Sequence, residues 1–375
     1  MKILHVATTI NRGGAENHLV DLVAGQVKRG HNVSVAYLKG DGYWTSKFVE
    51  LGVPTVSLRL GRYGELQPLF KLRSWLRHWA PDLVHAHLPP AELYTRFALV
   101  GTSRGIDFVI TKHADIGFLE GSRGKQSSKT GRWLARWVAS RAKRIIAVSE
   151  AVKDFHAGPC ENLGENKFRV VLHGVDAQRF QRVTTDEIRG VRKFFGFANE
   201  DFVVGTVARL APEKNLDVLL RGFARFVERN QKTSQLLLVG EGPLEEELRL
   251  LATQLGIADL TTWAGFREDI PVIMNLMDVF VLTSGQEGFG IVLLEAMASG
   301  TPAIATSVGA IPEVVGSNGA GIIISKGDHK ALADALATFT DDLRRNNAGL
   351  IAQRRIAEQF DLDRMVDETL SAYGP

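Results

Sequence analysis

The stretch FVVGTVARLAPEKNLDVLLRGFARFVERNQKTSQLLLV, residues 202–239, indicates how the chain folds. An apolar run at 202–208 is followed by an amphipathic segment at 215–229 and by a second apolar run at 235–239. A buried strand, a helix and another buried strand form a βαβ unit, in which the two strands are parallel. The sequence therefore predicts an α/β fold built on a parallel sheet.

The same alternation continues in both directions from this stretch. We expect helices that include 14–29, 66–79, 131–143 and 243–255, and strands at 2–7, 32–38, 82–86, 107–111, 144–148, 168–172, 261–264, 279–282, 302–305 and 321–324. The pattern restarts near residue 202, so we predict two Rossmann-like, doubly wound parallel-sheet domains in tandem. Ligands bind at the carboxyl ends of parallel strands, so we expect the two domains to face a deep cleft.

The expected domain limits follow from the restart of the pattern. We assign residues 1–175 to an N-terminal domain, 176–355 to a C-terminal domain and 356–375 to a C-terminal helical segment. The polar stretch at 174–200 shows little periodicity, and we predict that it is a linker.

Composition favours a globular, cytoplasmic protein. The chain has 375 residues, of which 45% are hydrophobic and 23% are charged. The opening MKILHVATT is typical of a buried first strand and not of a signal peptide, and no run reaches the roughly 18 apolar residues that span a bilayer. The single cysteine, Cys160, cannot form an internal disulfide and argues against a cysteine-based metal site.

The net charge of +3 hides an asymmetry between the two halves. Residues 1–175 carry 25 basic and 14 acidic side chains, and the remainder carries 20 basic and 28 acidic ones. The halves therefore differ by sign, +11 against −8. We expect the basic half to face an anionic partner.

A glycine pair marks the first turn from strand to helix. This turn contains Gly13 and Gly14, followed by Glu16, in TTINRGGAE at 8–16. Glycines let backbone amides approach a ligand closely, and the helix that follows offers its positive end to an anion. The turn is not the G-x-G-x-x-G fingerprint, which weakens the alternative of a nicotinamide-dependent dehydrogenase.

The stretch TSGQEGFGIVLLEAMASG at 283–300 carries two carboxylates in an unusual setting. Glu287 lies in a glycine-rich loop after a strand, with Gly288 and Gly290 beside it. Glu295 lies in a helix whose neighbours are almost all apolar. A buried carboxylate is costly unless it accepts hydrogen bonds, and sugar or ribose hydroxyls could supply them.

Two cations follow the strand at 202–208. Arg209 and Lys214 lie in ARLAPEKN, at the strand end where a diphosphate would be held. A diphosphate leaving group requires cations or helix N-termini where its charge develops.

These segments together resemble the GT-B-fold retaining glycosyltransferases of family 4, the glycosyl transferases group 1, over essentially the whole chain. The matching segments are GGAE at 13–16, DLVHAHLPP at 82–90, VSE at 148–150, HGVD at 173–176, VARLAPEKN at 207–215, LLLVGEGPLEEELR at 236–249, WAGFRED at 263–269 and EGFGIVLLEAMASGTPAIAT at 287–306. The spacing from Glu287 to Glu295 matches the signature of that family.

The resemblance implies a role for each candidate residue. Glu287 would hold donor-sugar hydroxyls, Glu295 the ribose, and Arg209 and Lys214 the diphosphate. The predicted donor site is Gly13, Gly14, Arg209, Lys214, Glu287, Gly288, Phe289, Gly290 and Glu295. His113 matches the strand-end histidine beside the reacting sugar, and it completes a catalytic set with Glu287, Arg209 and Lys214.

The acceptor side is expected on the N-terminal domain, and the 356–375 segment is expected to cross back to that domain. Glu16 and His87 are the acceptor-side candidates. We assign His85 and His87 to opposite faces of one strand, so that at most one lines the cleft, and expect His85 to be packed in the sheet.

The implied activity is transfer, with retention, of a hexose from a nucleotide diphosphate sugar, with uridine the better guess for the base. We expect a cell-envelope glycan or lipid-linked acceptor, no metal and no cofactor. Asp361-Leu362-Asp363 lies in the last helical region and not in a donor loop. The alternatives are a sugar-nucleotide epimerase of the same architecture and a non-catalytic sugar-nucleotide-binding protein.

Two basic segments suggest a location at the inner face of the cell membrane. Residues 121–149 contain eight Lys or Arg, no acidic residue, and Trp133 and Trp137. The segment 68–79 adds Trp75 and Trp79 among further cations. Basic helices with tryptophan suit anionic membrane surfaces, or else the tryptophans pack inward and the charges are solvated. We expect no nucleic-acid partner.

Overall fold

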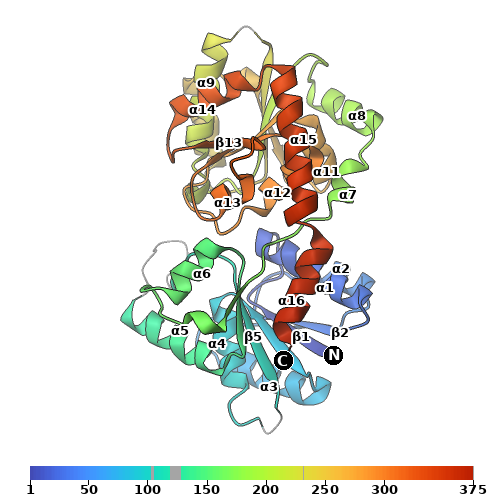
Figure 1. Cartoon of the computed structure of the whole chain (residues 1–375), viewed down its shortest axis with the longest axis vertical. Coiled ribbons are helices and arrows are strands. Elements are labelled where there is room, and N and C mark those ends of the chain that lie inside the picture. The colour runs from blue at the N-terminus through green and yellow to red at the C-terminus, as the bar shows by residue number, and fades with distance from the viewer. Residues whose placement is uncertain (103–104, 119–127, 231, 375) are drawn as a thin grey trace. The chain divides into compact units, whose positions relative to one another are not determined.

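The computed structural model describes residues 1–102, 105–118, 128–230 and 232–374 (Figure 1). The chain divides into two compact units, each with its own parallel sheet. Unit 1 comprises Met1–His173 and Leu362–Pro375, and unit 2 comprises Gly174–Asp361.

Unit 1 contains a seven-stranded sheet in the order β3-β2-β1-β4-β5-β6-β7. Its strands are β1 Lys2–Ala7, β2 Asn32–Tyr37, β3 Thr55–Ser57, β4 Leu83–His87, β5 Asp107–Lys112, β6 Arg144–Ala147 and β7 Phe168–Val170. Every pair of neighbours is parallel, and His5 of β1 lies opposite His85 of β4. Strands run outward in both directions from the β1–β4 pair, so the order reverses there.

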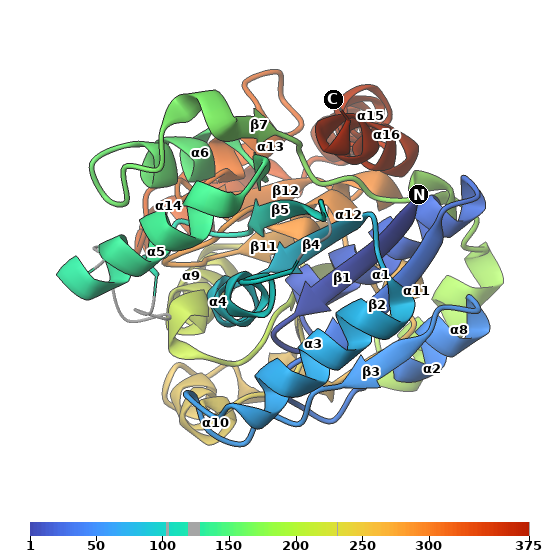
Figure 2. The same cartoon turned by 90° about the horizontal axis from the view of Figure 1, so that it is seen from below.

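Helices cover both faces of this sheet. They are α1 Gly14–Lys28, α2 Thr45–Glu50, α3 Gln67–Trp79, α4 Pro89–Ala98, α5 Lys129–Arg141, α6 Glu150–Ala157 and α16 Leu362–Tyr373. Leu4 and Val84 point to the face packed against α3, α4 and α5, and Figure 2 shows α3 and α4 on one side of β1 and β4. Ile3 and Leu83 point to the opposite face, against α1 and α16. Alternation along each strand therefore separates two cores.

Unit 2 repeats the plan with a six-stranded parallel sheet in the order β10-β9-β8-β11-β12-β13. Its strands are β8 Phe202–Val207, β9 Ser234–Val239, β10 Thr261–Gly265, β11 Val279–Leu282, β12 Ala303–Thr306 and β13 Gly321–Ile324. Its helices are α7 Ala177–Gln181, α8 Thr185–Phe195, α9 Leu216–Arg229, α10 Glu245–Gln254, α11 Ile270–Leu276, α12 Ile291–Ser299, α13 Ile311–Val315, α14 His329–Thr338 and α15 Asp342–Gln359. The strand order reverses at β8 and β11.

The predicted pair of doubly wound parallel sheets is confirmed. The predicted linker at 174–200 is wrong, because this stretch contains α7 and α8, which pack on α12 and α11. The overlooked signal was a capping box at the start of α8. The Thr184 side chain accepts from the Glu187 amide, and the Glu187 carboxylate accepts from the Thr184 amide.

The predicted limit at residue 355 falls inside α15, and unit 2 continues to Asp361. The helix α16 belongs to unit 1, where it packs against α1. Arg29 of α1 donates to the carboxylates of Asp363 and Asp367 on α16.

Unit 1 also buries histidines. His5, His18, His85, His87 and His173 are at most 7% exposed, and His113, which follows β5, is half-buried. Burial lowers the pKa of His5 and of His113 to about 4. Burial, followed by repulsion between neighbouring imidazoles, lowers the pKa of the other four well below 6.5. These rings are therefore neutral in the folded protein at pH 7.

The close packing of α16 predicts an effect at one glycine. A Cβ on Gly25 of α1 would lie 2.5 Å from Cγ2 of Val366, so Gly25→Ala must displace α16. We expect a loss of about 1–3 kcal/mol in the free energy of unfolding, as for other overpacked cores. Gly190, in the exposed interior of α8, has open space around it, and Gly190→Ala should gain about 0.5–1 kcal/mol. Urea unfolding, monitored by tryptophan fluorescence and circular dichroism, measures the free energy of unfolding of both variants. Equal changes in the two variants would contradict the close packing of α16 on Gly25.

Neutral buried histidines predict a loss of stability in acid. Below about pH 6.5 the unfolded chain binds protons that the folded protein does not, so the free energy of unfolding should fall as the pH drops from about 6.5 toward 4. Each such histidine contributes a slope of up to about 1.4 kcal/mol per pH unit. Urea titrations between pH 7 and 4.5 measure the slope. His113→Gln should reduce the slope by one histidine's share, and an unchanged slope in this variant would contradict a neutral His113 in the folded protein.

Candidate functional site

In unit 2 the loops after β8 and β11 lie at the place where the strand order reverses. Ligands of doubly wound sheets bind at this place, outside the carboxyl ends of the strands. The first loop carries Arg209 and Lys214, and the second carries Glu287, so the sequence-predicted donor residues lie on the two neighbouring strand ends.

Backbone contacts fix the two loops to each other. The amide of Gly285 donates to the carbonyl of Glu213 at 2.8 Å, and Oγ1 of Thr283 donates to the carbonyl of Lys214 at 3.0 Å. A Cβ on Gly285 would approach the Asn215 side chain to 2.8 Å. A larger residue at this position would have to displace the Asn215 side chain.

Lys214 and Glu287 form an ion pair across these loops. Nζ of Lys214 lies 2.5 Å from Oε2 of Glu287, and Oγ of Ser284 donates to the same oxygen at 3.0 Å. The two charged side chains are 19% and 17% exposed, so both are held in place yet remain accessible. Sequence reasoning assigned both Lys214 and Glu287 to the donor site, but it predicted neither their ion pair nor Ser284.

The second loop ends at the N-terminus of α12. Gly290 has φ 83° and is the N-cap of α12, which has no side-chain cap. Phe289 is 3% exposed and its ring centroid lies 6.0 Å from that of Phe360, so this residue anchors the loop. Gly288 lies between Phe289 and Glu287, and the helix end beyond them favours negative charge.

The two other charged residues predicted for the donor site differ in exposure. Arg209 is exposed, and among the described residues it forms no ion pair with Glu287. Glu295 is half-buried in the second turn of α12.

In unit 1 the glycine turn precedes α1. Gly13 is the N-cap and Gly14 the first helical residue. Oγ1 of Thr9 donates to the Glu16 carboxylate, and a Cβ on Gly13 would collide with that carboxylate. The acceptor-side candidate Glu16 is thus folded back on the turn after β1.

His113 and His87, predicted for different roles, are in contact. Nε2 of His113 lies 3.2 Å from Nδ1 of His87. His87 is 2% exposed and its Nε2 lies 2.9 Å from Nδ1 of His5. His113 therefore continues the contact that joins His5 and His87.

The assignment of His85 and His87 to opposite faces is wrong. Side chains two residues apart in a strand point to the same face, and the two ring centroids lie 4.1 Å apart. Both face α1 and α16 together with His5.

Sequence reasoning missed most of the residues that continue this contact. His5 Nε2 lies 2.8 Å from Oε1 of Gln26, and Nε2 of Gln26 donates to the Tyr373 hydroxyl at 3.1 Å. Nδ1 of His85 lies 2.7 Å from that hydroxyl, and its Nε2 lies 2.6 Å from Oγ1 of Thr111. A histidine inside the apolar strand KILHVA and a glutamine on the apolar side of α1 were the available signals.

Charged side chains hold the chain on both sides of His113. Nζ of Lys112 lies 2.8 Å from Oε2 of the buried Glu92. Glu161 contacts the His156 ring at 2.7 Å and accepts from the Phe118 amide at 2.8 Å. Burial would raise the pKa of Glu161, but the hydrogen bond with His156 and the Lys112 charge lower it to about 2.

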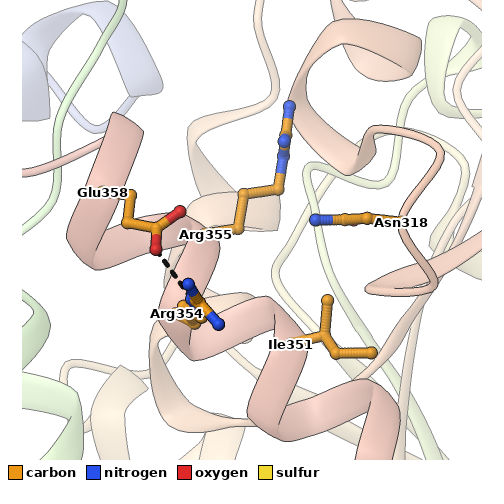
Figure 3. A pocket seen from close by; sticks show the side chains of 5 residues that line it. All are labelled: Asn318, Ile351, Arg354, Arg355 and Glu358. Atoms are coloured by element: carbon orange, nitrogen blue, oxygen red, sulfur yellow. Dashed lines mark hydrogen bonds and ion pairs between the residues drawn. The ribbon is translucent and has the colours of Figure 1, made fainter.

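A hollow of about 350 Å³ lies elsewhere on unit 2, along α15 (Figure 3). Its lining residues are Asn318, Ile351, Arg354, Arg355 and Glu358. Arg354 donates to Glu358 at 2.7 Å, and Arg355 donates to the carbonyls of Val314 and Glu313. These guanidinium groups support the fold, so we do not assign this hollow as the site.

Among the described residues, no helix combines the length and apolar character needed to cross a membrane.

Two family models match this chain. Glycosyltransferase Family 4 matches residues 12–179, and Glycosyl transferases group 1 matches residues 188–355. The protein EpsD of Bacillus subtilis (strain 168), which carries a glycosyltransferase name, is 30% identical over 270 residues, covering 70% of this chain and 68% of EpsD.

Two further relatives cover more of the chain. The UDP-Gal:alpha-D-GlcNAc-diphosphoundecaprenol alpha-1,3-galactosyltransferase of Escherichia coli is 26% identical over 330 residues, 86% of this chain and 82% of that protein. The crystal structure of Anabaena Alr3699/HepE in complex with UDP-glucose is 26% identical, with a TM-score of 0.84 over 99% of each chain. The predicted GT-B architecture is thereby confirmed. The chain belongs to the group 1 glycosyltransferases of family 4, and it is a hexosyltransferase that moves a sugar from a nucleotide sugar to a glycan or lipid acceptor.

Proposed function

We propose that the protein is a retaining, metal-independent hexosyltransferase that takes its sugar from a UDP-linked donor. The carrying observation is the Lys214–Glu287 ion pair, supported by Ser284 at the point where the second sheet reverses. In this pair, a cation suited to a diphosphate lies in direct contact with a carboxylate suited to sugar hydroxyls.

Each member of the pair has capacity left for a ligand. An ammonium group has three donors, and Lys214 uses one toward Glu287, which leaves others for diphosphate oxygens. Oε2 of Glu287 accepts from Lys214 and Ser284, so Oε1 is available to sugar hydroxyls. Gly13 and Gly14 would bring backbone amides to phosphate or sugar, and Glu295 would bind the ribose.

The proposed reaction replaces one bond at the anomeric carbon. The bond to the leaving phosphate oxygen breaks, the acceptor oxygen bonds to the same face, and the acceptor proton passes to the leaving phosphate. Negative charge grows on the departing diphosphate, where Lys214, Arg209 and the N-terminus of α12 would stabilise it. This set of positive groups is why the proposal requires no metal and no cofactor.

Relatives support the choice of donor and acceptor. The solved HepE complex contains UDP-glucose, and the name of the Escherichia coli relative gives a UDP-galactose donor and a lipid diphosphate acceptor. We therefore favour a UDP-hexose and a cell-envelope glycan or lipid-linked acceptor, used at the cytoplasmic face of the membrane.

In the structure, fewer tryptophans of the two basic segments are available for the proposed membrane contact than the sequence suggested. Trp75 and Trp79 pack against the core, and Trp137 packs on Phe97 with ring centroids 4.7 Å apart. Trp133 of α5 is 63% exposed, and so is available to a membrane. Part of the 121–149 segment, residues 121–127, lies outside the described residues.

The donor proposal predicts a response to one nucleotide sugar. A panel of UDP- and GDP-sugars should contain a donor that raises the melting temperature and is slowly hydrolysed in the presence of a chelator. Glu287→Gln and Lys214→Met should each lower transfer by about 10²-fold or more, as expected for groups that stabilise developing charge, and Arg209→Ala should also lower it. Glu245→Gln, which breaks an exposed pair with Arg249, is the matched control. Absence of any stabilising donor, or dependence on added metal, would contradict the proposal.

The membrane proposal predicts that one exposed tryptophan matters. Co-sedimentation with vesicles rich in anionic phospholipid should fall several-fold for Trp133→Ser, because an interfacial aromatic ring is lost. Phe194→Ser removes an aromatic side chain of unit 2 that is 71% exposed, and it should have no effect. Equal binding by both variants and the parent protein would rule out a contact through α5.

A further inference from the structure

The buried polar side chains of unit 1 form one continuous series of hydrogen bonds. It runs through Thr111, His85, Tyr373, Gln26, His5, His87 and His113. These residues come from β1, β4, β5, α1 and α16, and the loop after β5. The series therefore connects α16 to the residue that the sequence assigns to catalysis.

A series of neutral imidazoles has a direction. Each neutral ring carries one proton, so one nitrogen donates and the other accepts. Burial keeps these rings neutral, since it lowers the pKa of His5 to about 4 and that of His87 well below 6.5. Once one end of the series is fixed, every proton along it is fixed.

Gln26 lies at one end of the part of the series that runs through His5 and His87 to His113, and it fixes the direction of that part. Its Oε1 can only accept, so His5 carries its proton on Nε2 and presents Nδ1 as an acceptor. His87 then donates from Nε2 to His5 and accepts at Nδ1. His113 donates from Nε2 to His87, which leaves Nδ1 of His113 without a proton.

Tyr373 holds the amide of Gln26 in this orientation. Nε2 of Gln26 donates to the phenolic oxygen, and the phenol in turn donates to Nδ1 of His85. His85 then donates from Nε2 to Oγ1 of Thr111. If the amide were turned over, every proton in the series would move to the other nitrogen.

The series ends on an acceptor with nothing to accept. Nδ1 of His113 is buried and has no hydrogen-bond partner among the described residues. Buried polar atoms in folded proteins are nearly always paired, so an unpaired acceptor on a proposed catalytic residue points to a ligand donor. A sugar hydroxyl has this chemistry.

We propose that Gln26 is a positioning residue for sugar transfer: acting through His5 and His87, it keeps Nδ1 of His113 unprotonated as the hydrogen-bond acceptor for a sugar hydroxyl. The proposal rests on the proposed function, because it assumes that His113 contacts the sugar. It assigns a purpose to buried groups that the proposed reaction does not itself use.

Three of the buried histidines are also close enough to bind a metal ion, but their hydrogen bonds disfavour metal binding. One ring nitrogen each of His5, His85 and His87 lie within 4.8 Å of one another. However, both ring nitrogens of all three already have partners in the series. A cation would have to displace those partners inside a core that is at most 2% exposed at these residues.

Nitrogen-15 spectra of the full chain labelled at histidine test the proposal without any sugar. In the parent protein, His5, His87 and His113 should each show a protonated Nε2 and an unprotonated Nδ1, with signals assigned from single His→Gln variants. In Gln26→Met, which keeps the side-chain length and removes the strong acceptor, the three rings should lose this single state. A parent His113 protonated at Nδ1, or zinc bound stoichiometrically at these rings, would overturn the proposal.

Kinetics then separate positioning from stability. Gln26→Met should lower kcat/KM for transfer by about tenfold, the value of one hydrogen bond. The control is Ser34→Ala, which removes a buried hydroxyl that donates to the Pro54 carbonyl at 2.8 Å and accepts from Trp75 at 3.2 Å. It should destabilise unit 1 while preserving the histidine spectrum and the rate. Equal rate losses in the two variants, or an altered spectrum with an unchanged rate, would refute positioning, whereas a parent protein with the expected spectrum that uses no nucleotide sugar would contradict the proposed function.

Discussion

One constraint governs both sheets of this protein: a parallel strand is joined to the next one by a crossover connection. Where the connections from two adjacent central strands lead in opposite directions, the carboxyl ends of these two strands are left uncovered. β1 and β4 meet this condition in unit 1, and β8 and β11 meet it in unit 2. The glycine turn and the histidines occupy the first place, and the Lys214–Glu287 pair occupies the second. The chemistry of the transferase is therefore located by topology, and the side chains determine only what is done there.

The cost of removing polar groups from water is the second constraint on this fold. A buried imidazole or amide is tolerated only when its hydrogen bonds are made, and in unit 1 the partners come from segments remote in sequence. His5 depends on Gln26 and His87, and His85 depends on Tyr373 and Thr111. Because these buried side chains are hydrogen-bonded to one another, each is satisfied only when all of its partners are in place. The ionised groups around Glu161 follow the same rule one loop away.

Local pattern was enough to predict both sheets and the donor loops, because strand periodicity and glycine-rich turns are properties of short windows. It failed at 174–200, where the Thr184–Glu187 capping box and the helical spacing of Ile188, Val191 and Phe195 mark α8 among many polar residues. It could not predict that Gln26 and Tyr373 meet, because that contact joins residues 347 positions apart. The opposite faces assigned to His85 and His87 were an error of strand geometry, which the two-residue repeat of a strand corrects.

The membership of α16 in unit 1 has a consequence for biosynthesis. Unit 2 is one continuous stretch, Gly174–Asp361, whereas unit 1 is interrupted by it. A ribosome that works from the N-terminus releases all of unit 2 before it releases Tyr373. The second sheet can thus fold during translation before Gln26 and His85 of the first unit have their Tyr373 partner, which is supplied only when α16 emerges. The order of synthesis therefore completes the polar core of unit 1 only after the whole of unit 2 has been made.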